Sequence, residues 1–170
     1  SATPGTSVTP GASNALGSWT QILSGASVAN DVMGFRLQVT NGATSAASKL
    51  HLVDIGIDPA GGTSYTAIIS NLACGGSGAV TNGASLQWFF PLRIRAGASV
   101  AARVRGSNAT AGTVRVAIRG YGKLSRPEVM PVGSYTETLG YTADTLGTSF
   151  TPGNAADGSW ASLGTTTKHL

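Results

Sequence analysis

The chain has 170 residues, of which 87 are Gly, Ala, Ser or Thr, and its formal net charge is +4. Charged residues make up 11% of the chain, against about 25% in an ordinary soluble domain. This composition excludes a charge-driven disordered protein and a collagen, and no run of about 20 apolar residues could span a membrane. Acids, bases and metal ligands are so scarce that we expect no enzymatic activity, no cofactor and no metal site.

The predicted elements are short β-strands. Apolar and polar residues alternate in brief runs separated by Gly, Pro, Asn and Asp, and no segment keeps a 3.6-residue apolar period. We expect strands near residues 5–9, 18–23, 33–40, 49–57, 63–70, 86–95, 99–105 and 112–120. About eight strands at this spacing predict an all-β fold, an antiparallel, jelly-roll-like β-sandwich, with the order of the strands left open.

Turn residues separate several of these strands. Asp58 and Pro59 open the sequence DPAGG, which predicts a tight turn because proline presets φ and glycine permits positive φ. We expect this turn, with Asp58 and Pro59 as structural residues, to join 50–57 to 63–70 as a hairpin. Two further hairpins are expected at 96–97 and 108–112, joining 88–95 to 99–105 and 99–105 to 113–119.

Most of the arginines fall on one side of the later strands. In 88–95, 100–105 and 113–119, alternate residues are apolar and are predicted to face the core, Trp88 among them, while the arginines have the opposite parity. Arg36 has the same relation to its apolar neighbours in an earlier strand. If these strands are neighbours, they form one basic sheet face with no acid in the same strands. The candidate partner-binding residues are Arg36, Arg93, Arg95, Arg103, Arg105, Arg115 and Arg119.

Three interpretations of this basic face stay open. It is a solvated outer face, if the arginine stems cover the sheet while the guanidinium groups remain in water. It is a docking surface for an acidic protein, if the planar guanidinium groups pair with carboxylates. A nucleic-acid surface is the least favoured of the three, because Phe89 is the only aromatic residue expected on this face and stacking platforms are missing.

The residues that could carry catalysis have simpler structural explanations. His51 lies in an apolar strand, and His169 stands next to the last residue, where chain ends are usually too mobile for catalysis. Cys74 has no evident cationic partner and is expected to be a buried small residue. Asp54 and Asp58 lie roughly 13 Å apart along one strand, whereas a glycosidase pair needs about 5–9.5 Å. We expect Asp54 to pair with an arginine instead.

The opening of the chain recurs near its end. Residues 5–19 read GTSVTPGASNALGSW and residues 147–160 read GTSFTPGNAADGSW, with nine identical positions once one residue is deleted. We therefore expect a complete domain at 1–132 and, at 133–170, a linker with the first strands of a second repeat. Two strands cannot bury a core alone, so either the natural chain continues or this arm packs on the first domain or on a neighbouring molecule.

Several segments, together with this duplicated opening, resemble one group of proteins. These segments are VDIGIDPAGG at 53–62, FPLRI at 90–94, GTVRV at 112–116 and VGSY at 132–135. They are similar to tailed-bacteriophage virion structural proteins built of tandem β-sandwich modules, and the resemblance spans most of the chain. It carries no functional residues over to this sequence.

The resemblance implies a non-enzymatic component of a virion, synthesised in the host cytoplasm. A capsid decoration (cement) protein that binds the shell through protein–protein contacts is the first hypothesis, and a tail or fibre anchoring module is the second. The implied partners are the major capsid protein or tail proteins, together with further copies of this chain in a homo-oligomer. Neither a membrane nor a nucleic acid is expected as a partner.

A carbohydrate-binding module is a third hypothesis, from a different class of function. Trp19, Trp88 and Trp160 could offer stacking surfaces to a sugar ring. We expect structural roles for all three instead, because Trp88 has the parity of the core and Trp19 and Trp160 occupy matching positions in the repeat.

Overall fold

The computed structural model describes residues 5–41, 49–76, 85–107, 112–122, 135–140, 148–151 and 158–166. A short 3-10 turn, η1 (Gly25–Ser27), follows the second strand. The strands in chain order are β1 (Thr6–Val8), β2 (Thr20–Leu23), β3 (Val32–Asn41), β4 (Lys49–Asp58), β5 (Thr66–Gly76), β6 (Ser85–Phe90), β7 (Ser99–Gly106), β8 (Val114–Gly122) and β9 (Thr136–Glu137). The first eight lie where the sequence predicts strands, and β9 is additional.

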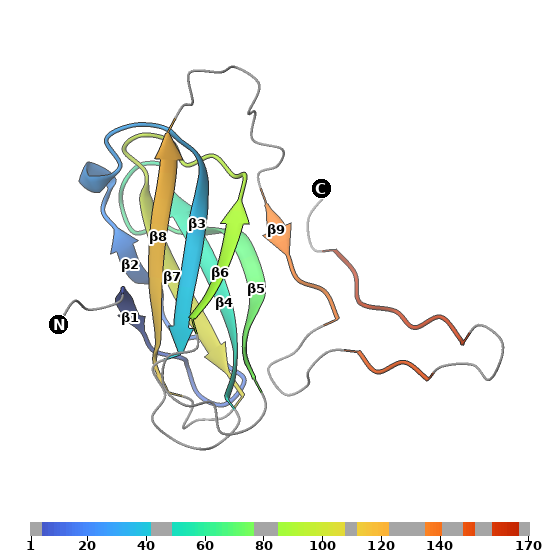
Figure 1. The fold of residues 1–170 in the computed structure, drawn as a ribbon. Helices are drawn as coiled ribbons and strands as arrows, with labels where there is room; N and C mark the ends of the chain where they lie inside the picture. Colours follow the sequence, from blue (N-terminus) through green and yellow to red (C-terminus); the bar gives the residue numbers. More distant parts are fainter. Residues whose placement is uncertain are drawn as a thin grey trace.

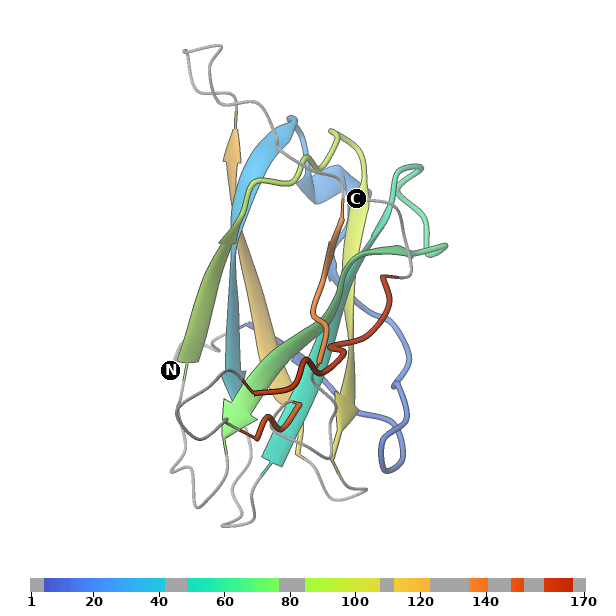
Figure 2. The same ribbon diagram turned by 90° about the vertical axis from the view of Figure 1, so that its right-hand side faces the viewer.

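The strands form two sheets that face each other (Figures 1 and 2). One sheet has the order β1-β8-β3-β6 and the other has the order β2-β7-β4-β5-β9. The first strand pairs with the eighth, the second with the seventh, the third with the sixth and the fourth with the fifth, always antiparallel. This is the pairing of a jelly roll, a long antiparallel ribbon folded over on itself. The predicted all-β sandwich is therefore confirmed.

The hydrophobic core lies between the two sheets. Along β3, Phe35, Leu37 and Val39 are buried and alternate with polar residues, because successive side chains of a strand point to opposite faces. The predicted core side of the later strands is also confirmed, although β6 ends at Phe90 and the chain continues toward β7 without a regular strand. Trp88 is half-buried against this core. The buried residues of this side are Phe90, Leu92, Ile94, Val100, Ala102, Val104, Val114 and Val116.

The hairpin predicted at DPAGG joins β4 to β5 as expected. Ile57 of β4 is paired with Thr66 of β5, and the turn between them is capped by a carboxylate. Asp58 accepts hydrogen bonds from the backbone N–H of Ala60 at 2.9 Å and of Ser64 at 2.8 Å. An aspartate that bonds the backbone two residues on is a recurrent device for stabilising a turn.

The two other predicted hairpins are wrong. The turn at 96–97 is real, with the N–H of Ala98 bonded to Arg95 and a positive φ at Gly97, but β6 and β7 belong to different sheets. The strands β7 and β8 likewise belong to different sheets, and residues 108–111 between them lie outside the described residues. Turn residues predict where the chain changes direction. They do not determine which sheet the next strand joins, because that depends on the folding over of the whole ribbon.

The chain after β8 returns to the edge of the larger sheet. β9 pairs in parallel with β5, with Ile69 opposite Thr136 and Ser70 opposite Glu137. The segments 148–151 and 158–166 lie beyond this edge, away from the two sheets (Figure 1). The predicted domain boundary near residue 132 falls outside the described residues and stays a prediction.

Candidate interaction surfaces

The structure divides the candidate arginines among three places, so the single basic face does not form. Arg36 is on β3 and Arg115 and Arg119 are on β8, all in the four-stranded sheet. Arg103 and Arg105 are on β7, in the five-stranded sheet, and the chain between β6 and β7 holds Arg93 and Arg95. The expected face required β6, β7 and β8 to be neighbours, and the jelly-roll order separates them.

Arg93 is engaged at the rim of the sandwich. Its guanidinium forms an ion pair with the carboxylate of Asp31, which also accepts the backbone N–H of Ala96 at 2.9 Å. The hydrogen bond from Ala96 and the ion pair with Arg93 lower the pKa of Asp31 below its usual value. Both side chains are exposed, so this pair organises a turn and adds little to stability.

Arg103 is engaged on the outer face of the five-stranded sheet. Its Nε lies 2.9 Å from the carboxylate of Asp54, which is almost fully buried and also accepts the N–H of Asn71 at 2.8 Å. The expectation that Asp54 pairs with an arginine is confirmed. The guanidinium carbon also lies 4.4 Å from the centre of the Trp19 ring, a cation–π contact.

Trp19 is held in place from below and from the side. A Cβ at Gly56 would lie 2.7 Å from the indole ring, so only glycine leaves room for it over β4. The ring of Tyr65 packs at 5.7 Å, and the side chain of Gln21 donates a hydrogen bond to the hydroxyl of Tyr65 at 3.1 Å. These contacts give Trp19 a structural environment on the outer side of the sheet.

The remaining arginines of the four-stranded sheet stand on its outer face. Arg36 of β3 lies directly opposite Arg119 of β8, and Arg115 lies opposite Thr40. No described residue forms an ion pair or a hydrogen bond with these three arginine side chains. The sequences of β1, β3, β6 and β8 contain no Asp or Glu, so the charge of this face has no acidic neighbour in its own strands.

A shallow depression lies between the two opposed arginines. Its volume is about 230 Å³. Side chains from β3, β6 and β8 surround it, namely Arg36, Gln38, Gln87, Ala117, Ile118 and Arg119. The site therefore offers several N–H donors around a space that can admit a side chain.

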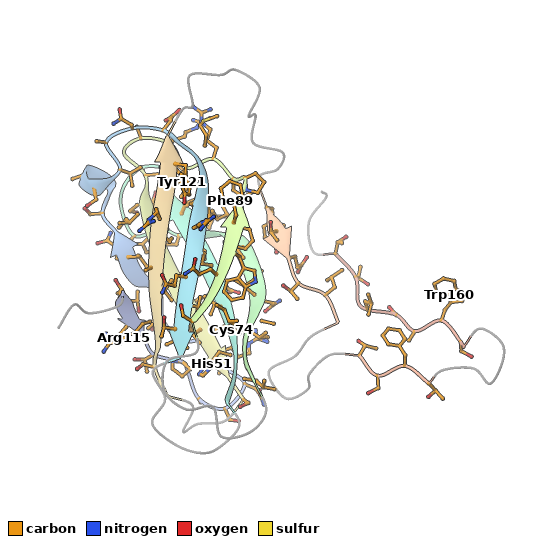
Figure 3. The ribbon with its side chains drawn as sticks, in the orientation of Figure 1. His51, Cys74, Phe89, Arg115, Tyr121 and Trp160 are labelled. Atoms are coloured by element: carbon orange, nitrogen blue, oxygen red, sulfur yellow. The ribbon has the colours of Figure 1, made fainter. Side chains whose placement is uncertain are left out.

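An aromatic pair adjoins this depression, and sequence reasoning missed half of it. Phe89 of β6 is opposite Arg36, and its ring meets the ring of Tyr121 edge to face, with the centroids 6.0 Å apart. Phe89 is 55% exposed and Tyr121 is 38% exposed. Figure 3 shows both rings toward one end of the sheet and Arg115 toward the other. The parity that links Arg115 to Arg119 continues to Tyr121, so the signal was present in the sequence.

Two of the chemically reactive residues, His51 and Cys74, are packed in structural positions, whereas His169 lies outside the described residues. His51 is buried, with Nε2 at 3.1 Å from the carbonyl oxygen of Gly112. Cys74 is buried too, and the burial raises the pKa of its thiol to about 12. Within the described ranges, no three His, Cys, Asp or Glu residues come together as a possible metal site. No helix in that part of the chain has the length and apolar character needed to cross a membrane.

The arm, defined here as segments 148–151 and 158–166, exposes its large apolar side chains. Trp160 is fully exposed, and Phe150 and Leu163 are more than half exposed. Among the described residues, a hydrogen bond joins the arm to the chain before it, from the hydroxyl of Thr148 to the carbonyl oxygen of Gly140 at 3.2 Å. Exposed apolar residues at this density are typical of a surface that another molecule or segment covers.

Comparisons with other proteins add no relative. No protein-family model matches the chain, and neither a curated protein nor a solved structure matches it.

Proposed function

We propose that this chain is a non-enzymatic structural component of a phage particle, and in the first place a capsid decoration protein. The proposal rests on one observation above all: the arm repeats the opening segment of the sandwich while leaving its apolar residues exposed. Exposed apolar residues of this kind can pack against another β-sandwich of the same type. Joining sandwich modules in this way is a structural role and not a catalytic one.

The glycines of the opening segment are sterically required. A Cβ would lie 2.6 Å from the carbonyl oxygen of Val116 at Gly5, 2.7 Å from that of Leu16 at Gly11 and 2.4 Å from that of Thr9 at Gly17. Real Cβ atoms do not approach backbone so closely. The repeated sequence at 147–160 has glycine at all three matching positions, which are Gly147, Gly153 and Gly158.

The apolar residues of the two copies differ in their surroundings. Val8 is fully buried in the first copy, whereas its counterpart Phe150 is exposed. Trp19 is half-buried against its sheet, whereas Trp160 is fully exposed. Leu163 follows Trp160 at the interval at which Ile22, packed against the core, follows Trp19. The arm thus has the sequence of an opening segment without a sandwich around it.

Other observations support the particle role. The jelly roll is a frequent architecture of viral capsid proteins, although a fold alone does not assign a function. The sequence segments that resemble phage virion proteins include the capped β4–β5 hairpin. A carbohydrate-binding role is less favoured, because Trp19 already contacts Arg103 and Tyr65 and Trp88 is half-buried against the core.

The experiment that tests the proposal is imaging of the particles of the phage that encodes this chain. Antibody-labelled or tagged chain on the head shell at symmetry-related sites is the expected result. Label confined to the tail or its fibres would contradict the decoration hypothesis and support the tail or fibre anchoring module. Absence of the chain from purified particles would contradict any structural role in the virion.

A further inference from the structure

We infer that the outer face of the four-stranded sheet is a docking surface for an acidic segment of a partner protein. We call it the arginine–aromatic face, and it consists of Arg36, Arg115, Arg119, Phe89 and Tyr121. Carboxylates of the partner pair with the arginines while an apolar side chain lies on the two rings. The inference holds whether or not the protein belongs to a phage particle, since it rests on this face alone.

The arginine–aromatic face is positively charged. Arg36 and Arg119 are directly opposite each other on adjacent antiparallel strands. Like charges in this arrangement destabilise a sheet. A carboxylate placed between them removes the repulsion and adds charge-assisted hydrogen bonds, which guanidinium groups form in a bidentate manner.

Two acids of the chain pair with arginines outside this face. Asp31 lies beside Arg93 and Asp54 lies beside Arg103, so two of the few carboxylates already neutralise other arginines. None lies in the strands of the arginine–aromatic face. The charge of Arg36, Arg115 and Arg119 is therefore not matched by acids of their own strands, which makes this face complementary to an acidic surface.

The depression on this face is small. Its volume of about 230 Å³ is below the range of about 300–1,000 Å³ that is usual for small-molecule pockets. It has room for a side chain of the partner, and the small side chain of Ala117 leaves space between Arg36 and Arg119. The amide of Gln87 adds a further polar group at the margin. An Asp or Glu side chain fits within this space and can accept hydrogen bonds from these donors.

An aromatic pair lies beside the depression. Phe89 lies against β3 because residue 34 is glycine, where a Cβ would come within 2.9 Å of the ring. Tyr121 holds the ring from the side. Tyrosine and arginine are among the residue types that most often dominate the binding energy of protein interfaces. The pair supplies an apolar anchor next to the charged groups.

A nucleic acid is the less favoured occupant. The two rings meet at 65°, edge to face, and so do not present successive parallel surfaces for stacked bases. Binding through phosphates depends on many cationic contacts, and this face offers three arginines. A protein segment that combines carboxylates with one apolar residue fits the face better.

The test uses the full chain and poly-L-glutamate as an acidic polypeptide probe, at about 0.15 M salt. Backbone NMR should show the largest shifts at Arg36, Arg119, Phe89 and Tyr121. The variant R36Q/R119Q should bind the probe at least about tenfold more weakly. The matched control R93Q/R95Q, which removes the same charge elsewhere, should bind within about twofold of the original chain.

Each alternative outcome decides against the inference. Unchanged binding by R36Q/R119Q, or equal losses in both variants, would show that the probe responds only to net charge. Tighter binding of a single-stranded DNA oligonucleotide than of poly-L-glutamate, lost in R36Q/R119Q, would assign the face to nucleic acid. Melting curves of both variants distinguish a loss of binding from a loss of folding.

Discussion

Gly17 and Gly56 show how closely single residues control the backbone of this sandwich. A Cβ at Gly17 would meet the carbonyl oxygen of Thr9, and a Cβ at Gly56 would meet the indole of Trp19. Neither neighbour can move away easily, because one is backbone and the other is a ring packed against Tyr65. At these positions the high glycine content of the chain has a steric cause.

We expect Gly17→Ala to lower the free energy of unfolding by about 1–3 kcal/mol, as overpacking does in other proteins. Urea denaturation measures the change. Gly122→Ala is the matched control, since the nearest atom to a Cβ there is 3.9 Å away. The control should stay within about 0.5 kcal/mol of the original chain, and equal losses in both variants would contradict the steric explanation.

Cys74 provides a test of burial that depends on pH. Its thiol has a pKa raised to about 12 by burial, against an ordinary value of 9.0. Between these values the unfolded thiol loses its proton and the folded one keeps it, so the free energy of unfolding should fall as pH rises above 9.0. Below that pH the group contributes no pH dependence.

Urea titrations on either side of this pH, compared with Cys74→Ala, isolate the contribution of the thiol. The native thiol should also resist alkylation that proceeds rapidly in urea. Rapid alkylation of the folded chain would show that Cys74 is accessible.

At the scale of elements, the β4–β5 hairpin illustrates a structure that local sequence encodes. Asp58 ends the strand, bonds two backbone N–H groups of the turn and is itself buried. Gly61 then takes the positive φ that the turn requires. The segment from Asp58 to Ser64 contains each of these parts within seven residues, so no distant contact is needed to predict the turn.

Asp58→Ala would leave the N–H groups of Ala60 and Ser64 without their acceptor. We expect the free energy of unfolding to fall by about 1–3 kcal/mol, the usual loss when a buried partner is removed. Thermal and urea unfolding measure it. Asp31→Ala removes a carboxylate of an exposed turn and should have a clearly smaller effect, so a reversed order would refute the importance of the Asp58 cap.

At the scale of the whole molecule, the folding of the ribbon decides which charges meet. It places Arg36 against Arg119 and Arg103 against Asp54, although both contacts join strands far apart in sequence. An arginine therefore faces a like charge in the four-stranded sheet and a carboxylate in the five-stranded sheet.

We expect arginine substitutions in the two sheets to change stability in opposite directions. Arg119→Gln should raise the free energy of unfolding by up to about 1 kcal/mol, because it removes a like-charge pair, and the gain should shrink in high salt. Arg103→Gln should lower it by about 1–3 kcal/mol, since buried Asp54 loses a partner that is itself partly solvated. Changes of the same sign in both variants would contradict the assigned neighbours.

The arm leads to an expectation about association. Its exposed Phe150 and Trp160 should bury themselves against another copy when no other sandwich covers them, so the chain should self-associate with increasing concentration. Light scattering after size exclusion measures this. The double variant F150S/W160S should remain monomeric over the same concentration range. If the original chain is also monomeric, the arm does not mediate contacts between copies.

The sequence by itself determined where the strands lie, which side of each is apolar and where the DPAGG turn forms. These features depend on neighbouring residues, because alternation and turn geometry are local properties of the backbone. Only the tertiary structure decided that β6, β7 and β8 alternate between the sheets, and hence that Arg36, Arg115 and Arg119 share a face with Phe89 and Tyr121 but not with Arg103. That partition comes from the pairing of β1 with β8 and β2 with β7, since strands from opposite ends of the domain must meet before either sheet can cover the core.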